Sequence, residues 1–264
     1  MLPRLMIASP SGRSGKTTIA TGLCALLKKR GLTVQPFKKG PDYIDASWLT
    51  AASRRACRNL DVFLMGNELL SKCFFEASDD ADIAIIEGNM GLYDGIDTSG
   101  TGSSASIARF LHCPVILVVN TVRITRSVAA MIQGYRNFEP DTDIAGVILN
   151  NVSGMRHAMK LIDAIEKYCG LPVLGVLPRN PVLNINERHL GLTPYIEVGD
   201  GSPFIDDIVA FMENNLNVEE ILKAASYTSE SGKSGKRKDE CRGKVSPNVK
   251  IGIFYDAAFS FYYP

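Results

Sequence analysis

A segment near the N-terminus has the residue types and spacing of a phosphate-binding loop. Residues 9–18 read Ser-Pro-Ser-Gly-Arg-Ser-Gly-Lys-Thr-Thr, between an apolar run and a helical pattern, which is the context of a Walker A motif. In such a loop, inward-pointing backbone N–H groups and a helix N-terminus surround phosphate oxygens. We expect Lys16 to reach the β- and γ-phosphates of ATP, and Thr17 to offer its hydroxyl to Mg²⁺. The predicted nucleotide-binding residues of this segment are Gly12, Arg13, Ser14, Gly15, Lys16, Thr17 and Thr18.

The loop departs from the usual pattern at one position. Pro10 stands where the first glycine of Gly-x-x-x-x-Gly-Lys-Ser/Thr is expected, so close approach of the backbone to a ligand depends on Gly12 and Gly15. A simple glycine turn is therefore the alternative interpretation. The strand and helix patterns on either side favour the phosphate loop.

A charged turn follows the second apolar run. It reads Lys-Lys-Gly-Pro-Asp-Tyr-Ile-Asp at 38–45, and the Gly-Pro pair makes it tight. Because ligands of parallel sheets bind beyond the carboxyl ends of the strands, this turn should lie on the same rim as the phosphate loop. Lys38 can assist with phosphate charge, and Asp42 or Asp45 can hold magnesium, directly or through water. A surface turn with solvated charges is the alternative.

An acidic residue directly follows the apolar run 83–86. Glu87 opens the segment Glu-Gly-Asn-Met-Gly-Leu-Tyr-Asp-Gly at 87–95, and this is the position from which a Walker B acid faces the metal. The glycines leave room for a bulky ligand, which Asp94 can contact or whose reacting group it can position. A loop that is glycine-rich for structural reasons alone is the alternative. The predicted metal ligands are Thr17, Asp45 and Glu87.

Two later segments carry polar side chains suited to recognition. Asn150 lies in Asn-Asn-Val at 150–152, and a side-chain amide can both donate and accept, as an adenine edge requires. A helix cap is the alternative for this residue. His189 lies in the charged loop Glu-Arg-His-Leu-Gly-Leu at 187–192, where it is either a substrate contact or a structural histidine.

The elements that would position these residues alternate along the chain. The order of strands and helices is that of a doubly wound, mostly parallel α/β sheet covered on both faces. The strand-like runs lie at 5–8, 34–37, 83–86, 115–119, 145–149 and 173–176, and the helical patterns at 16–29, 68–77, 105–111, 125–135, 155–168 and 204–214.

Composition limits the partners and the number of domains. The formal net charge of +1 over 264 residues offers no broad basic field, so we expect no nucleic acid partner. No run is long and apolar enough to span a membrane and no signal peptide is apparent, so we expect a cytoplasmic protein. Residues 1–224 suffice for one α/β domain, and 225–248 read as a flexible linker rich in Ser, Lys and Gly. The last segment, 249–264, begins with a strand-like run at 249–254.

Taken together, these segments resemble the cobyrinic acid a,c-diamide synthase family, relatives of dethiobiotin synthetase that amidate carboxylates on corrin and related tetrapyrrole rings. The resemblance covers nearly the whole chain. It rests on Ser-Gly-Lys-Thr-Thr at 14–18, Gly-Pro-Asp-Tyr-Ile-Asp at 40–45, Arg-Asn-Leu-Asp at 58–61, the 87–95 segment, and Glu-Arg-His-Leu-Gly at 187–191.

The resemblance implies a dethiobiotin synthetase-like P-loop domain that uses ATP and Mg²⁺ to activate a carboxylate as an acyl phosphate, which ammonia or glutamine-derived nitrogen then converts to an amide. The resemblance also implies a homodimer and a class I glutaminase domain, of which residues 249–264 would be the start. Such a glutaminase uses a cysteine nucleophile. Because no cysteine follows Cys241, we expect no glutamine hydrolysis by this chain. Asn150 would read adenine. The implied catalytic residues are Lys16, Lys38, Asp45, Glu87 and Asp94, and the implied substrate contacts are Asp42, Tyr43, Asp94 and His189.

Two alternatives to the amide ligase remain at this stage. A regulatory ATPase of the ParA/MinD type would hydrolyse ATP without any acceptor, but it gives no reason for the 40–45 and 87–95 motifs. A tetrapyrrole carrier without activity would have no need for Lys16, Thr17 and Glu87. Cobyrinate, hydrogenobyrinate, sirohydrochlorin and nickel-sirohydrochlorin all stay open as the acceptor.

Overall fold

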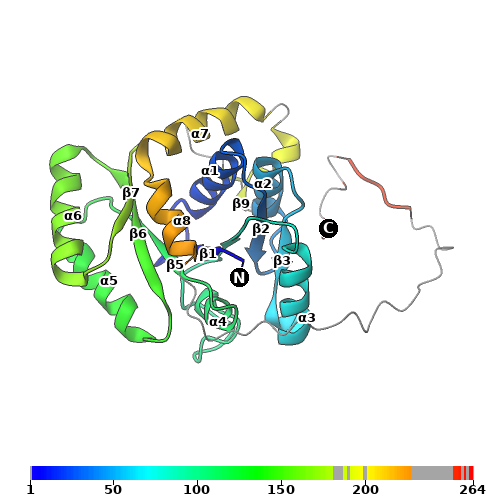
Figure 1. The fold of residues 1–264 in the computed structure, drawn as a ribbon, viewed down its shortest axis with the longest axis horizontal. Coiled ribbons are helices and arrows are strands. Elements are labelled where there is room, and N and C mark those ends of the chain that lie inside the picture. The colour runs from blue at the N-terminus through cyan, green and yellow to red at the C-terminus, as the bar shows by residue number, and fades with distance from the viewer. Residues whose placement is uncertain are drawn as a thin grey trace.

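A parallel β-sheet forms the centre of the molecule (Figure 1). The structure is a computed structural model and describes residues 2–180, 187–188, 191–198, 201–226, 252–256, 259 and 262–263. Within these residues the sheet has seven strands, in the order β3-β2-β4-β1-β5-β6-β7, and all neighbours pair in parallel. The strands are β1 (Arg4–Ala8), β2 (Val34–Lys39), β3 (Arg58–Leu60), β4 (Ile83–Glu87), β5 (Val115–Asn120), β6 (Ile144–Val152) and β7 (Val173–Pro178).

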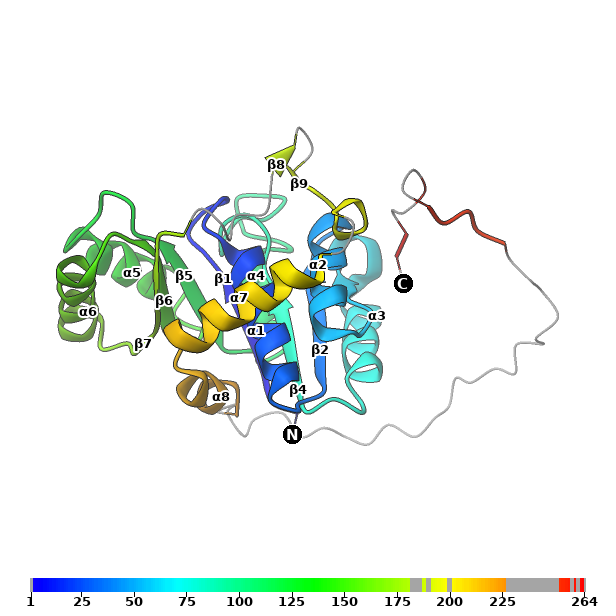
Figure 2. The same cartoon turned by 90° about the horizontal axis from the view of Figure 1, so that it is seen from above.

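Helices cover both faces of this sheet, as the apolar runs predict. One face packs against α3 (Val62–Ala77), α4 (Ser104–Phe110), α5 (Ser127–Phe138) and α6 (Met155–Cys169). The other packs against α1 (Lys16–Lys29), α2 (Ile44–Ser53), α7 (Ser202–Asn215) and α8 (Val218–Ser226). Figure 2 shows α1, α2, α7 and α8 on the near side of the strands. The doubly wound α/β fold expected from the sequence is therefore confirmed.

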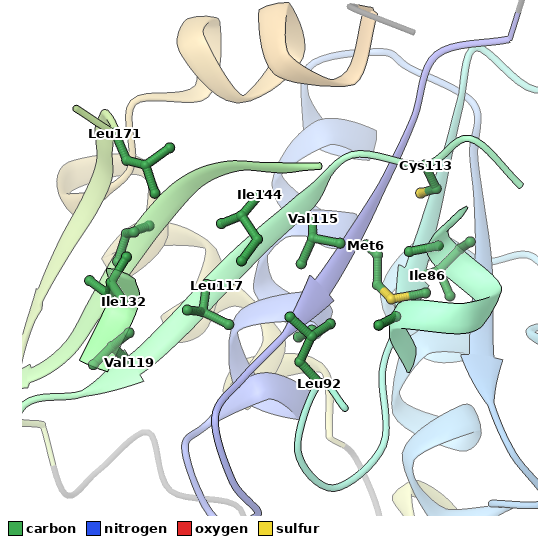
Figure 3. Close-up of a cluster of buried hydrophobic side chains, with 14 of the residues drawn as sticks. Met6, Ile86, Leu92, Cys113, Val115, Leu117, Val119, Ile132, Ile144 and Leu171 are labelled. Carbon is green, nitrogen blue, oxygen red and sulfur yellow. The ribbon is translucent and has the colours of Figure 1, made fainter. Parts of the chain in front are cut away.

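Alternation along the strands produces two separate hydrophobic cores. In β1, Leu5 and Ile7 face the core on the α1 side, whereas Met6 and Ala8 face the core on the α3 side. Figure 3 shows Met6 beside Ile86 and Val115 in this second core. Because a strand between two helical layers buries every side chain, its sequence reads as a continuous apolar run rather than an alternating one.

The strands and helices predicted within residues 1–224 are all present, and several short elements were not predicted. Of the strand-like run predicted at 249–254, the described residues 252–254 form no strand. Strand β3 has only three residues, too few for a pattern. Helix α2 begins within the segment interpreted as a turn, because the Oδ1 atom of Asp42 accepts the N–H groups of Ile44 and Asp45 and caps the helix. Helix α3 begins six residues earlier than predicted; it is interrupted by Gly66, whose φ of 67° is not helical.

Residues 193–195 contact α2 from the segment that follows the sheet. The 187–192 segment, interpreted as a charged loop, contains the antiparallel strands β8 (Glu187–Arg188) and β9 (Gly191–Leu192), and His189 lies outside the described residues. A 3₁₀ turn, η2 (Tyr195–Glu197), follows, and Trp48 Nε1 donates to the carbonyl of Thr193 at 2.9 Å. Of the predicted linker, residues 225 and 226 complete α8 and the rest lie outside the described residues. None of the described helices combines the length and apolar character that a membrane span needs.

Candidate functional site

The phosphate loop joins β1 to α1 at the carboxyl edge of the sheet. Gly15 occupies the N-cap position of α1 with a φ of 88°, and no side chain caps the helix, so the first N–H groups of α1 are available to an anion. The hydroxyls of Ser9 and Ser14 both donate to the carbonyl oxygen of Ser11, at 2.6 and 2.9 Å. These bonds close the turn of the loop.

Lys16 lies inside the loop rather than in solvent. Its Nζ atom donates to Ser9 Oγ and to the carbonyl of Met90, both at 2.8 Å, and to the carbonyl of Ser11 at 3.3 Å. Burial lowers the pKa of Lys16 to about 8, against the opposing effect of the Glu87 carboxylate. A lysine poised in this way gains a stronger partner when phosphate oxygens enter the loop.

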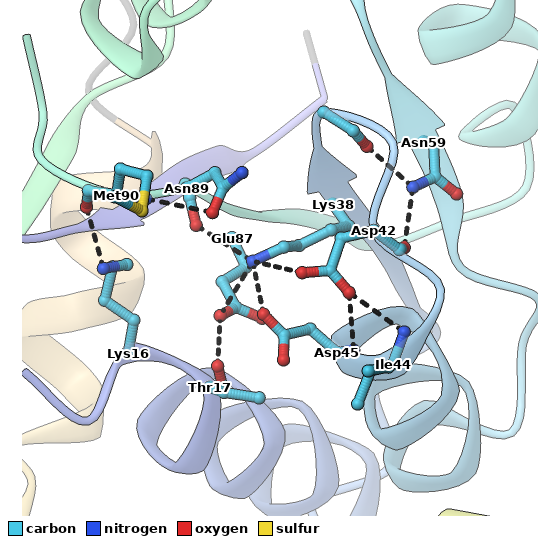
Figure 4. A network of polar contacts seen from close by, with 12 residues as sticks. Lys16, Thr17, Lys38, Asp42, Ile44, Asp45, Asn59, Glu87, Asn89 and Met90 are labelled. Atoms are coloured by element: carbon cyan, nitrogen blue, oxygen red, sulfur yellow. Dashed lines mark hydrogen bonds and ion pairs between the residues drawn. The ribbon is translucent and has the colours of Figure 1, made fainter. Parts of the chain in front are cut away.

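A second lysine, Lys38, binds the carboxylates that follow β2 and β4. Its Nζ atom lies 2.6 Å from Asp45 Oδ2, 3.2 Å from Glu87 Oε1 and 4.0 Å from Asp42 Oδ2. Figure 4 shows these side chains converging from the strand ends and from α2, with Thr17 approaching from α1. The parallel register pairs Lys38 directly with Glu87, which explains why residues 49 positions apart meet here.

Burial sets the electrostatics of this cluster. Lys38 is 1% exposed and Glu87 is fully buried. Burial raises the pKa of Glu87 to about 7, although Lys38 opposes the shift. For Lys38, burial favours the neutral form, but Glu87, Asp45 and Asp42 together outweigh it and raise the pKa above its ordinary value. Burial and the neighbouring Asp45 also raise the pKa of Asp42. Lys38 therefore stays protonated across the physiological range.

The arrangement of Thr17 and Glu87 fits a magnesium ion. The Thr17 hydroxyl donates to Glu87 Oε1 at 2.6 Å, and the buried Glu87 Oε2 atom has no hydrogen-bond partner. An orphaned buried carboxylate oxygen beside a hydroxyl is the donor set that a P-loop Mg²⁺ uses, with phosphates and water completing its coordination. The described residues contain no cluster of three or more His, Cys, Asp or Glu side chains arranged for a metal, so a site built from protein ligands alone is not present there.

The 87–95 loop packs directly against the phosphate loop. The N–H of Leu92 donates to the carbonyl of Ser9 at 2.8 Å, and a Cβ atom on Gly91 would lie 2.6 Å from the carbonyl oxygen of Pro10. Asp94 accepts the N–H of Gly91 at 2.8 Å through Oδ2. Asp94 therefore closes its own turn, and its carboxylate is near enough to raise the proton affinity of Lys16.

Asn150, predicted to read adenine, contacts the phosphate loop from β6. Its Nδ2 atom donates to the carbonyl of Ser14 at 2.9 Å, and its Oδ1 atom accepts the N–H of Asn151. A Cβ atom on Gly15 would lie 2.3 Å from the same Nδ2 atom. Asn150 is thus placed beside the nucleotide loop and supports it.

The structure brings most of the predicted site residues together. Those joined by hydrogen bonds or ion pairs are Thr17, Lys38, Asp42, Asp45 and Glu87. Lys16, whose charge interacts with that of Glu87, lies alongside with Ser14, Gly15 and Asn150. Gly12 and Arg13 lie on the exposed side of the phosphate loop, and Thr18 is half-buried in the first turn of α1. The ring of Tyr43 lies 4.6 Å from that of Tyr263 rather than in the cluster.

Sequence reasoning missed two residues that shape the site. Ser9 accepts a hydrogen bond from Lys16, and Asn59 donates to the carbonyls of Gly40 and Asp42 at 2.8 and 2.9 Å, which fixes the charged turn. Asn59 lies in the 58–61 motif, for which the residue types alone predict no role. No signal in the sequence marks its role, because its partners are backbone carbonyls reached across the pairing of β3 with β2.

Comparison of the sequence with known proteins identifies a family. The model of the CobQ/CobB/MinD/ParA nucleotide binding domain matches residues 5–192. A cobyrinate a,c-diamide synthase of Methanosarcina acetivorans is 46% identical over 99% of this chain and 55% of its own length. Those of Magnetococcus marinus and Archaeoglobus fulgidus are each 42% identical, over 100% and 99% of this chain and 57% of their own lengths. The chain thus spans somewhat more than half the length of these relatives.

Solved structures resemble the chain more distantly. The chloroplast FtsY of Physcomitrella patens superposes with a TM-score of 0.49 and 18% identity, covering 79% of this chain and 65% of that protein. This similarity is too low to support an argument about function.

Proposed function

Because the chain belongs to the family of CobQ/CobB/MinD/ParA nucleotide binding domains, we propose that it is the ATP-dependent part of an enzyme that amidates the a and c acetate carboxylates of a corrin or related tetrapyrrole. The observation that carries the proposal is the convergence of Lys16, Thr17, Lys38 and Glu87 at one edge of the sheet. The 40–46% identity to cobyrinate a,c-diamide synthases supports the class of acceptor.

The first chemical step is transfer of the γ-phosphoryl group of ATP to an acceptor carboxylate. An oxygen of the carboxylate forms a bond to phosphorus, the bond to the β-phosphate oxygen breaks, and ADP leaves. Phosphoryl transfer needs positioning and neutralisation of charge more than covalent help from the protein. Lys16 supplies a cation at the phosphate loop, and the protonated Lys38 supplies a second one between that loop and the 40–45 turn.

The second step converts the acyl phosphate to an amide. Ammonia, free or derived from glutamine, forms a bond to the acyl carbon, phosphate leaves, and the nitrogen loses a proton. Glu87 and Asp45 hold Lys38 in place during both steps. Mg²⁺, held by Thr17 and Glu87 with Asp45 nearby, would supply charge neutralisation on the transferred phosphoryl group. Asn150 is proposed to contact adenine, and Asp42, Tyr43, Asp94 and His189 to contact the acceptor.

The domain organisation belongs to the same proposal. Residues 1–226, to the end of α8, form the ligase domain. The following residues up to 248 form a linker, and 249–264 the start of a class I glutaminase domain, in an enzyme that works as a homodimer. The relatives are longer than this chain, which leaves room for such a second domain in them.

Amidation can be tested with Mg-ATP, ammonium and a panel of acids: cobyrinate, hydrogenobyrinate, sirohydrochlorin and its nickel form. We expect one of these acids to stimulate ADP release and to show, by mass spectrometry, replacement of OH by NH₂ at its carboxyl groups. Lys16→Ala should abolish both signals. ADP release that no acid changes would instead favour a ParA/MinD-like regulatory ATPase and contradict the proposal.

A further inference from the structure

A cavity of about 720 Å³ lies beside the edge strand β3 and helix α3, outside the cluster described above. Its volume is in the range of small-molecule sites. The apolar part of its wall comes from Leu64, Met65 and Leu69 of α3, and Leu64 and Leu69 are 61% and 50% exposed. An exposed apolar wall of this kind suits the flat face of a large ring.

Among the residues that the structure describes, the guanidinium of Arg58 on the cavity wall has no partner. Asp61 caps α3, because its Oδ1 atom accepts the N–H groups of Phe63 and Leu64. The Nζ atom of Lys72 lies 3.8 Å from Oε1 of Glu76. Arg58, by contrast, forms no hydrogen bond or ion pair through its guanidinium with any residue that the structure describes. A half-buried arginine at a cavity wall with its donors unused is suited to bidentate binding of a carboxylate.

The cavity shares a wall with the reacting cluster. Pro41 and Asn59 line it, and Asn59 holds the carbonyls of Gly40 and Asp42 on the other side of the same turn. Tyr263 also lines the cavity and stacks on Tyr43 at 4.6 Å. A ring seated here would therefore have its edge at the turn that carries Asp42 toward Lys38.

We propose that this cavity binds the body of the tetrapyrrole acceptor and that Arg58 binds one of its peripheral carboxylates, so that a neighbouring acetate arm reaches Lys38. The proposal rests on the proposed function, because it takes the acceptor to be a polycarboxylate ring. It assigns Arg58 as a specificity-determining residue: it selects acids over neutral rings. Arg58 contacts the substrate and takes no part in binding ATP.

The test compares cobyrinate with its fully methylated ester, titrated by visible absorbance against the full chain with a non-hydrolysable ATP analogue present. Arg58→Gln should bind cobyrinate about 10- to 100-fold more weakly, the loss expected for one charge-assisted contact, and should bind the ester as the wild type does. Arg58→Lys should fall between, because lysine keeps the charge without the bidentate geometry. Arg156→Gln is the matched control, since Arg156 is an exposed arginine on α6, which packs against strands at the opposite edge of the sheet.

The outcomes separate this inference from the function on which it rests. Wild-type protein that amidates cobyrinate while Arg58→Gln binds it undiminished would overturn the cavity assignment alone. An equal loss for cobyrinate and for the ester would also overturn it, because the loss would then not depend on a carboxylate. Wild-type protein that neither binds nor amidates any acid of the panel would overturn both.

Discussion

Replacing Lys38 with methionine should strongly destabilise the folded chain. Methionine keeps much of the side-chain volume but removes the ammonium that lies 2.6 Å from Asp45 and 3.2 Å from Glu87. Glu87 is fully buried and its Oε2 atom already lacks a hydrogen bond, so the loss leaves a buried carboxylate with no cation. Removing one partner of a buried ion pair costs about 3–5 kcal/mol, which is a large part of the stability of most domains.

The destabilisation should depend on pH, with a definite sign. Burial raises the pKa of Glu87 in the folded chain to about 7, above the ordinary value of a glutamate. An acid whose folded pKa is raised contributes stability that is present below its unfolded pKa and is lost as the pH rises through the folded pKa. Without Lys38 this pKa rises further, and each further unit is worth about 1.4 kcal/mol. The cost of Lys38→Met should therefore be at least about 1 kcal/mol smaller near pH 5.5 than near pH 8.5.

Urea denaturation followed by circular dichroism, without nucleotide, measures this cost at both pH values. Lys29→Met is the matched control: Lys29 lies 2.8 Å from Glu213, but the two side chains are 58% and 43% exposed. An exposed pair of this kind contributes about 0–1 kcal/mol. A Lys38→Met cost as small as that of Lys29→Met, or one that does not change with pH, would refute the argument that the buried carboxylates require this cation.

Two further substitutions test how the site is supported. Gly15→Ala should weaken binding of a fluorescent ATP analogue by about 10-fold or more, because the position has a φ of 88° and the new Cβ atom would lie 2.3 Å from Asn150 Nδ2. Gly31→Ala, with a φ of 89° but nothing within 4 Å, controls for the backbone alone, and equal effects of the two would contradict a steric cause. Asn59→Ala should lower kcat/KM for the acceptor about 10-fold in steady-state assays, since two hydrogen bonds to the 40–42 turn worth about 1–3 kcal/mol together are lost. A parallel loss in ATP affinity would show that Asn59 does not act on the acceptor side.

The sequence was most informative where burial is continuous. Strands between two helical layers are apolar at every position, so runs such as 115–119 were found with nearly the right bounds. Strand β3 was missed because Arg58 and Asn59 on an edge strand carry no apolar signal, and the pairing of β3 with β2 depends on contacts that a single sequence does not display. Helix α2 was missed because its start depends on the capping side chain of Asp42, which was interpreted as a possible magnesium ligand and a substrate contact rather than as a helix cap.

In the site too, residues in local motifs were predicted, whereas residues whose roles depend on strand pairing were not. The Walker A spacing indicated Lys16 and Thr17 because their roles follow from local geometry, and Glu87 followed from its place at the end of a buried strand. The burial of Lys38 could not be predicted, since a lysine is seldom buried and only the register of β2 against β4 brings Glu87 to it. The role of Asn59 was hidden for a similar reason, because its partners are backbone carbonyls rather than residues of a recognisable type.

The substitution at the first Walker glycine has an explanation in the neighbouring loop. The backbone approaches closely between Pro10 and Gly91 of the neighbouring loop: a Cβ atom on Gly91 would lie 2.6 Å from the Pro10 carbonyl oxygen. The Tyr135 hydroxyl donates to the same oxygen at 2.8 Å. Lys16 also joins the two loops, because its Nζ atom donates to the carbonyl of Met90. The phosphate loop and the 87–95 loop are therefore one cross-linked unit. If a triphosphate binds Lys16 as proposed, its oxygens would compete with the Met90 carbonyl for the ammonium, so we expect nucleotide binding to change the loop that begins at Glu87.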